Sequence, residues 1–172
     1  MKNKGEILAG ILSEYGNCYF FLHNTKEKAI AEKIMSEGFI FENQLAHSTD
    51  RVNPNEPIEV TYFLFQRKDY GIHTMIIAIP KKIYDKYTAR SNELDVGIEE
   101  VMTISDPYIG ENDELIYTIS PKHILGYFNN KTGDFQNNRL WDPSFEPETL
   151  YGFERKIHGK KANGSKSEEY LE

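Results

Sequence analysis

The chain has 172 residues and one cysteine, and its 20 lysines and arginines against 27 aspartates and glutamates give a formal net charge of −7. This length and an apolar content of 39% favour one folded domain, which we place at residues 1–157, followed by a disordered polar tail over 158–172. The single cysteine excludes a disulfide framework and a zinc site built from several cysteines. No apolar run approaches the ~20 residues that a membrane span needs, and the N-terminus lacks the apolar segment of a signal peptide. We therefore expect a cytoplasmic protein that has no membrane partner.

The N-terminal quarter of the chain shows the pattern of a helix, a strand and a second helix. Apolar residues at helical spacing predict a helix over residues 5–15. The aromatic run CYFFL predicts a buried strand over 18–22. Asn24 or Thr25 is then expected to cap a helix that ends at the next glycine, because Asn24 with Glu27 approximates a capping box.

The remainder of the chain mixes short strands, helices and loops. Turn-forming residues interrupt any period over 39–57, so we expect a long irregular loop there. The elements expected after it are a helix over 58–68, a strand over 73–79, a helix over 81–87, a strand over 99–105, a loop over 106–113, a strand over 114–119, a single helical turn over 121–123, a strand over 124–129 and a turn over 129–134. Because strands and helices do not alternate strictly, the pattern predicts an α+β fold rather than a doubly wound parallel sheet.

Common catalytic and phosphate-binding motifs are missing from the chain. It holds neither a P-loop nor a GxGxxG turn, no GxSxG elbow, and no His/Cys cluster with the spacing of metal ligands, so we expect no metal site. Cys18 lies in an apolar run, and because reactive thiols need exposure and a positive neighbour, we interpret it as structural. Two groups of polar residues remain as candidates for chemistry.

The first candidate group is His23 with Asn24 and Thr25, at the predicted junction of strand and helix. Polar groups at such a junction point beyond the strand end, where the helix N-terminus offers free N–H donors. In a functional interpretation, His23 hydrogen-bonds a ligand hydroxyl while neighbouring backbone groups hold an amide. In the alternative interpretation, Asn24 and Thr25 only cap the helix and His23 is a boundary residue with satisfied hydrogen bonds.

The second candidate group is the acidic run from Glu111 to Glu114, directly before the strand LIYTI. A carboxylate at the edge of a strand can project into a cleft, where it can stabilise a developing cation or polarise a sugar hydroxyl. The alternative interpretation is a solvated acidic turn.

Taken together, the two groups resemble motifs of the ADP-ribosyltransferase-like superfamily. The string CYFFLHNTKEKAIAEKIMSEGF is similar to the family's opening motif, an apolar strand ending in His-Gly-Ser/Thr, then a helix and Ile-x-x-x-Gly-Leu/Phe. The string NDELIYTISPKHILGYF is similar to the last motif, in which a Glu opens an apolar strand followed by a short crossover and another strand. The resemblance covers about 40 residues, and its spacing suits small members such as RNA 2′-phosphotransferases and DNA-modifying toxins. It implies split mixed or antiparallel sheets with flanking helices around a cleft.

The resemblance also implies a reaction, in which NAD is the substrate and a protein or nucleic acid accepts ADP-ribose. His23 would contact the nicotinamide-side ribose, and the backbone at Asn24, next to Thr25, would hold the nicotinamide amide. Glu114 would bond the ribose hydroxyl and stabilise the oxocarbenium-like cation as nicotinamide leaves, which makes His23 and Glu114 the catalytic pair. Glu111 is a near neighbour, so the choice between the two carboxylates stays open.

The family's middle motif has a weaker counterpart. Its strand-end Ser/Thr matches Ser48 and Thr49, and its stacking aromatic matches Tyr70 or Tyr62. The chain departs from the family at Asn24, where the family has a glycine whose missing side chain lets the backbone approach nicotinamide. This departure leaves a second function open, a non-catalytic binding module whose altered nucleotide pocket acts through protein partners.

Two further groups are considered for surface contacts and packing. Cationic residues that could form a basic lip for a phosphate of NAD or of nucleic acid, or else a solvated surface, are Arg67, Lys68, Lys81, Lys82 and Arg90. Trp141, with the proline and phenylalanine that follow it, is expected to pack a C-terminal segment on the core.

Overall fold

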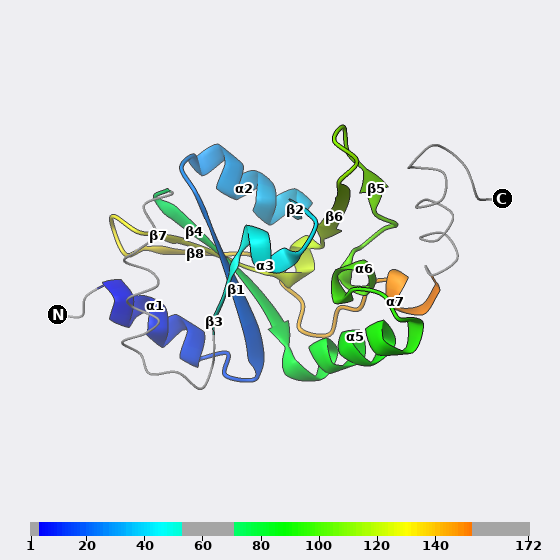
Figure 1. Ribbon diagram of the computed structural model, residues 1–172. Helices are drawn as coiled ribbons and strands as arrows, with labels where there is room; N and C mark the ends of the chain where they lie inside the picture. The colour runs from blue at the N-terminus through cyan, green and yellow to red at the C-terminus, as the bar shows by residue number, and fades with distance from the viewer. Residues whose placement is uncertain (1–3, 53–70, 153–172) are drawn as a thin grey trace.

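The computed structural model of this chain describes residues 4–52 and 71–152 (Figure 1). The strands are β1 (Cys18–Thr25), β2 (Phe39–Glu42), β3 (Asp50–Val52), β4 (His73–Pro80), β5 (Tyr108–Ile109), β6 (Leu115–Ile119), β7 (Ile124–Asn129) and β8 (Phe135–Asn137). The helices are α1 (Lys4–Ser13), α2 (Lys28–Glu37), α3 (Leu45–Ser48), α5 (Lys81–Leu94), α6 (Ile98–Met102), the 3₁₀ turn η1 (Pro121–His123) and α7 (Thr149–Gly152).

The described strands form two separate sheets. One has the order β3-β1-β4-β7-β8 and the other the order β2-β6-β5, and every pairing within them is antiparallel. The predicted α+β class is therefore confirmed, and the sheets are antiparallel and separate. Within the described residues, no helix is long and apolar enough to cross a membrane.

The larger sheet is covered on both faces, and its central strand, β4, is buried along its whole length. All eight residues of β4 are buried, which is typical of a strand with packing on both sides. Alternate residues of β1 divide between two apolar clusters. Phe20 and Leu22 pack toward α1 on one face, whereas Phe21 points to the other face, toward α2 and the smaller sheet (Figure 1).

The predicted boundary between β1 and α2 is wrong. β1 continues to Thr25, because β4 offers a partner for all eight of its residues, from Cys18 opposite Pro80 to Thr25 opposite His73. Helix α2 begins only at Lys28, and its N-cap residue Glu27 makes no side-chain cap. Asn24 and Thr25 therefore do not cap the helix, and the predicted capping box is absent from it.

Two other segments also differ from their predictions. The expected irregular loop over 39–57 contains β2, α3 and β3 up to Val52, because the short run FIFE alternates buried aromatics with exposed residues and pairs with β6. The expected strand over 99–105 is helix α6. The Glu100 carboxylate closes its first turn by accepting a hydrogen bond from Gly97 N–H at 3.2 Å. The negative charges of Glu99 and Glu100 in this first turn also stabilise the helix N-terminus.

Most of the remaining predicted elements agree with the structure. The helix over 5–15, the strands over 73–79 and 124–129, and the turn over 129–134 are confirmed within one or two residues, while α5 runs to Leu94. The single turn η1 is capped by the Ser120 hydroxyl, as its Ser-Pro sequence predicts. The predicted helix over 58–68, the aromatics Tyr62 and Tyr70, the cations Arg67 and Lys68 and the tail over 158–172 lie outside the described residues.

Two packing predictions are confirmed. Trp141 donates from its indole Nε1–H to the carbonyl of Ala78 at 2.9 Å, and it packs edge-on against Tyr15 with ring centroids 5.3 Å apart. Cys18 is fully buried, and burial raises its pKa to about 11, the reverse of what a nucleophilic thiol needs.

Candidate functional site

The candidate site lies where β1 extends beyond the end of its shorter neighbour β3. β3 pairs only with residues 20–22 of β1, so among the described residues the outer edge of His23–Thr25 faces no further strand. Helix α3 ends beside this edge at Ser48 and leads through Thr49 into β3. The mismatch in strand length therefore exposes backbone and side chains of β1 next to a turn of the chain.

Two hollows meet at this edge. The first has a volume of about 370 Å³ and is lined by Leu22, His23, Asn24, Ala46, His47, Ser48, Thr49 and Asp50. The second has a volume of about 330 Å³ and is lined by His23, Ile30, Lys33, Ile34, Glu37, Gly38, Phe39, Ile40 and Ser48. We call them the edge hollow and the helix hollow. They share His23 and Ser48, so these two residues form the wall between them.

The imidazole of His23 is fixed by two contacts. Its Nδ1 lies 2.8 Å from the carbonyl oxygen of Ser48, and its ring packs on Phe39 with centroids 4.7 Å apart. Because a carbonyl oxygen can only accept, Nδ1 must carry the proton and donate it. In the neutral ring, Nε2 is then left with a lone pair. His23 can therefore accept a hydrogen bond from a hydroxyl or N–H group of a ligand.

The next side chain of β1 after His23 is the amide of Asn24. Its Nδ2 is buried and has no hydrogen-bond partner among the described residues. A buried donor without a partner is costly, by about 1–3 kcal/mol, and such atoms are rare in folded proteins. Neighbouring residues of a strand face opposite sides, so this buried amide lies on the other face of β1 from the His23 ring, and only the backbone of Asn24 is shared with the open edge.

The remaining predicted residues of this group take different roles. Thr49 donates its buried hydroxyl to the carbonyl of Leu45 at 2.8 Å, which closes helix α3 and leaves this proton unavailable to a ligand. Ser48 acts through its carbonyl, as the acceptor for His23. Thr25 belongs to β1 but lines neither hollow. The structure thus places His23, Asn24, Ser48 and Thr49 around one hollow, with Thr25 beside them.

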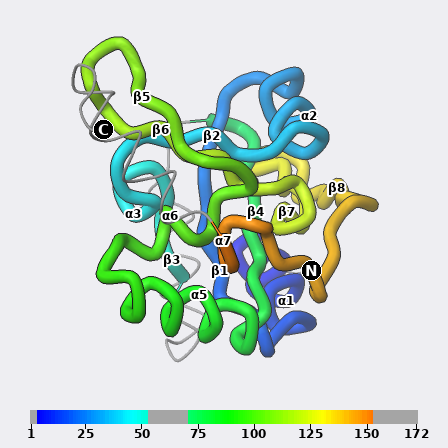
Figure 2. The backbone as a smooth tube through the Cα atoms, turned by 90° about the vertical axis from the view of Figure 1, so that its right-hand side faces the viewer, coloured from blue at the N-terminus to red at the C-terminus, as the bar shows by residue number. Residues whose placement is uncertain are grey.

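Glu114 does not belong to this group. It lines neither hollow, and its carboxylate turns back to its own hairpin, where Oε1 accepts from the N–H of Asn112 at 2.8 Å. Alternate residues of a strand face opposite sides, and Leu115 and Tyr117 pack in the core between the sheets, so Glu114 is on the other face. The β5–β6 hairpin projects from the body of the molecule in both ribbon and tube views (Figures 1 and 2).

The register of the smaller sheet gives the distance between Glu114 and the part of the sheet that contacts His23. Phe39, which contacts the His23 ring, pairs with Ile119, and Glu114 lies five positions before Ile119 in the chain. At about 3.3 Å per residue this corresponds to roughly 16 Å along the strand. Glu111 is exposed in the same hairpin loop and lines neither hollow.

Two other carboxylates do line the hollows, and the sequence analysis missed both. Asp50 follows Ser48 and Thr49 and lines the edge hollow, while Glu37 lines the helix hollow. The signal available for Asp50 was its place directly after the Ser-Thr pair. Glu37 has the appearance of any exposed helix residue, and only the packing of α2 on β2 shows that it borders a hollow.

Comparison of the chain with protein-family models, with curated proteins and with solved structures finds no match. The interpretation of the site therefore depends on the geometry of its own residues.

Proposed function

We propose that this protein binds NAD at the edge hollow, through the nicotinamide end of the molecule, in an arrangement similar to that of ADP-ribosyltransferase-like proteins. The observation that carries the proposal is the hydrogen bond from His23 Nδ1 to the Ser48 carbonyl at 2.8 Å. In the neutral ring it leaves Nε2 as an acceptor for a ligand, at the edge where the backbone of Asn24 faces no further strand among the described residues.

The two groups match the nicotinamide riboside half of NAD in hydrogen-bonding character. A ribose hydroxyl can donate to His23 Nε2, and the backbone at Asn24, on the outer edge of β1, can hold the nicotinamide carboxamide. The hollow volume of about 370 Å³ lies within the usual range of small-ligand sites, about 300–1,000 Å³, at its lower end. This volume fits one half of the dinucleotide, with the remainder outside.

Binding without transfer is the function that the geometry supports best. Glu114, the carboxylate that the resemblance assigns to the oxocarbenium-like cation, turns away into the β5–β6 hairpin. Without the Glu114 carboxylate, the loss of nicotinamide lacks the electrostatic stabilisation that the resemblance assigns to this residue. The protein would then act as a nucleotide-responsive module that transmits binding to a protein partner.

A second candidate function, transfer of ADP-ribose to a macromolecular acceptor, is favoured by one observation. The carboxylate-bearing residue Asp50 lines the same hollow as His23. In such a transfer the bond from ribose C1′ to the nicotinamide nitrogen breaks, and its electron pair leaves with neutral nicotinamide. The acceptor's nucleophile forms the new bond to C1′ and releases its proton to solvent. Asp50 would stabilise the cation between these events.

Isothermal titration calorimetry of the full chain with NAD tests the proposal. We expect binding by the natural sequence, a dissociation constant about tenfold higher in His23→Ala, corresponding to about 1.4 kcal/mol, and an unchanged one in Glu114→Gln. Absence of NAD binding, or equal weakening by both substitutions, would contradict it.

Chromatographic detection of free nicotinamide separates the two candidate functions. Binding without release of nicotinamide supports the module. Release that depends on Asp50, and is abolished in Asp50→Asn while NAD still binds, supports the transferase instead.

A further inference from the structure

A cluster of cations and aromatic rings lies away from the candidate site, at the start of β1 and α5. Arg51 is exposed, and its guanidinium carbon lies 4.7 Å from the centroid of the Tyr19 ring and 5.5 Å from that of Tyr84. Cations over tyrosine faces are attracted by the ring quadrupole. The two rings therefore hold this guanidinium in a fixed place at the surface.

Two lysines extend this cluster. Lys81 Nζ lies 5.7 Å from the centroid of the same Tyr19 ring, and Lys82 is exposed beside it. We call Arg51, Lys81 and Lys82 the cationic patch. Within the described residues none of the three forms an ion pair, although Lys86 and Arg90 further along α5 are both paired. Of the predicted basic lip, Lys81 and Lys82 therefore lie together, whereas Arg90 lies elsewhere on α5 and pairs with Glu93.

The position of the lysines is unfavourable for the helix that carries them. The first turn of α5 contains Lys81 and Lys82 and no acidic residue. Helix N-termini favour negative side chains and disfavour positive ones, by about 0.3–1 kcal/mol each. Helix stability alone does not explain two lysines here, whereas binding of an anion by their side chains does.

A third hollow adjoins the cationic patch. Its volume is about 520 Å³, and its lining residues are Asn17, Pro80, Lys81, Lys82, Pro143 and Ser144. Two proline rings provide apolar surface for a flat group, an amide and a hydroxyl provide polar atoms, and two lysines stand at the rim. These are the chemical features that a nucleotide requires.

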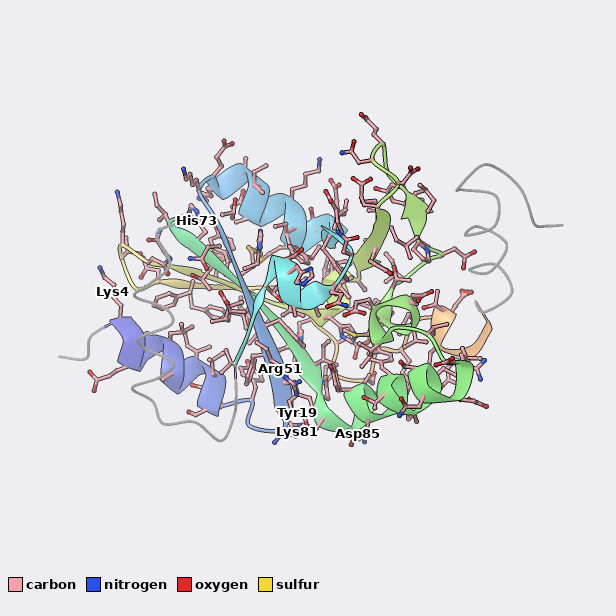
Figure 3. All side chains as sticks on the ribbon, in the orientation of Figure 1. Lys4, Tyr19, Arg51, His73, Lys81 and Asp85 are labelled. Atoms are coloured by element: carbon pink, nitrogen blue, oxygen red, sulfur yellow. The ribbon has the colours of Figure 1, made fainter. Side chains whose placement is uncertain are left out.

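Acidic groups also lie around the cationic patch. Asp85 lies near Lys81, one helical turn along α5 (Figure 3), but forms no ion pair with it. Asp142 accepts from both the N–H and the hydroxyl of Ser144. The net charge of the three cations and these two carboxylates is +1, in a chain whose formal net charge is −7.

We propose that the cationic patch and its hollow bind single-stranded nucleic acid without sequence preference. The phosphates lie along Arg51, Lys81 and Lys82, and one base enters the hollow beside the prolines. Proteins that bind single strands combine cations that follow the phosphate backbone with flat surfaces on which bases stack. A double helix has no free base that could enter such a hollow. The proposal does not depend on NAD binding.

The cationic patch and the candidate site share one face of β1. Tyr19 and His23 are four residues apart, so about 13 Å separate them along the strand. A strand bound at the cationic patch would therefore pass close to the edge hollow, within reach of two or three nucleotides.

Fluorescence anisotropy with a labelled 20-nucleotide oligothymidylate and the full chain tests this proposal. With three phosphate contacts, log Kd against log salt concentration should have a slope of about 2 in magnitude, since each contact to a single strand contributes about 0.7. The double variant Lys81→Gln/Lys82→Gln removes two contacts. We expect it to bind about tenfold more weakly at low salt and to show a slope of about 0.7.

The matched control is Lys4→Gln/Lys131→Gln, which changes the net charge equally. Lys4 lies well apart from Lys81 (Figure 3), and Lys131 is exposed in the β7–β8 turn. This control should bind like the natural sequence, and thermal unfolding should show both variants folded. Absence of binding to the oligonucleotide at low salt, equal weakening in both double variants, or tighter binding to a duplex of the same length would each overturn the proposal.

Discussion

The edge of β1 and the β5–β6 hairpin both carry the polar residues that the sequence marks for chemistry, yet they use them differently. At the edge of β1, His23 lies between two hollows, and the hydrogen bond from its ring to Ser48 leaves the other ring nitrogen for a ligand. In the hairpin, Glu114 satisfies the N–H of Asn112 and sits against Gly110. One region presents its functional group outward to a cavity, and the other uses it to close a turn.

The difference arises from strand alternation. On β1 the odd-numbered residues face the core between the sheets, so His23 follows Phe21 to that side and meets Phe39. On β6 the odd-numbered residues also face that core, which sends Glu114 to the opposite side. A shift of one residue in the hairpin would exchange Glu114 with Leu115 and change the chemistry of the core.

Glycine substitutions should give the largest difference in stability between the two regions. Gly38 borders the helix hollow at φ = 104°, and a Cβ there would lie 2.3 Å from the backbone oxygen of Ile119. We expect Gly38→Ala to lower the free energy of unfolding by about 3 kcal/mol or more, because neither the φ angle nor a sheet carbonyl can give way. At Gly110 the added Cβ meets only the end of the flexible Glu114 side chain, so Gly110→Ala should cost less than about 1 kcal/mol. Urea unfolding measures both, and equal losses would contradict this interpretation.

A second histidine sharpens the comparison through pH. His123 is fully buried, with Nε2 2.8 Å from the Tyr87 hydroxyl, and burial lowers its pKa from 6.5 to about 4. Between pH 6.5 and about 4, His123 binds a proton in the unfolded chain but not in the folded chain. Its contribution to the free energy of unfolding is therefore complete above pH 6.5 and declines as the pH falls toward 4. This single group should remove up to about 3 kcal/mol over that window.

The matched variant is His123→Gln, which keeps a hydrogen-bonding group toward Tyr87 but does not titrate. Urea unfolding at pH 7, 6, 5 and 4 should show a smaller decline for it than for the natural sequence. Parallel declines would assign the acid sensitivity to other groups. His23, by contrast, is only half-buried and lines both hollows.

Parts of this site could be predicted because their signals are local. His23 and Asn24 are polar residues directly after the apolar run CYFFL, whereas the Ser48-Thr49 pair was matched only through the family resemblance. The strand β4, HTMIIAIP, could be recognised as buried on both faces from its composition alone.

The remainder depends on contacts that are distant in sequence. β1 runs to Thr25 only because β4 is long enough to pair with it, and this cancels the predicted helix cap at Asn24. In LIYTI nearly every residue is apolar, so the sequence does not say which face is inward or where Glu114 points. The short run EEVMTIS suits a strand or a helix, and Gly97 with Glu100 decides for the helix.

The hydrogen bond of His23 allows a smaller test of the same comparison. His23→Phe retains an aromatic ring against Phe39 and removes the Nδ1–H donor to Ser48. Because the hollow admits water to the freed carbonyl, we expect a loss of only about 1 kcal/mol in the free energy of unfolding. His23→Ala, which also removes the ring packing, should lose more. If the two variants are equally stable, ring packing contributes nothing at this position.

The smallest expected effect concerns Glu114 and the separation between the two regions. Glu114→Gln keeps an oxygen acceptor for Asn112 N–H, so stability should change by less than about 0.5 kcal/mol. In a double-mutant cycle with His23→Phe, the coupling energy should also stay below about 0.5 kcal/mol, because side chains more than about 10 Å apart with no shared partner contribute additively. A larger coupling would mean that imidazole and carboxylate meet in solution, as the transferase pattern requires. A vanishing coupling, together with NAD binding that depends on His23 alone, would assign the nucleotide to the edge of β1 and leave the hairpin acid a purely structural role.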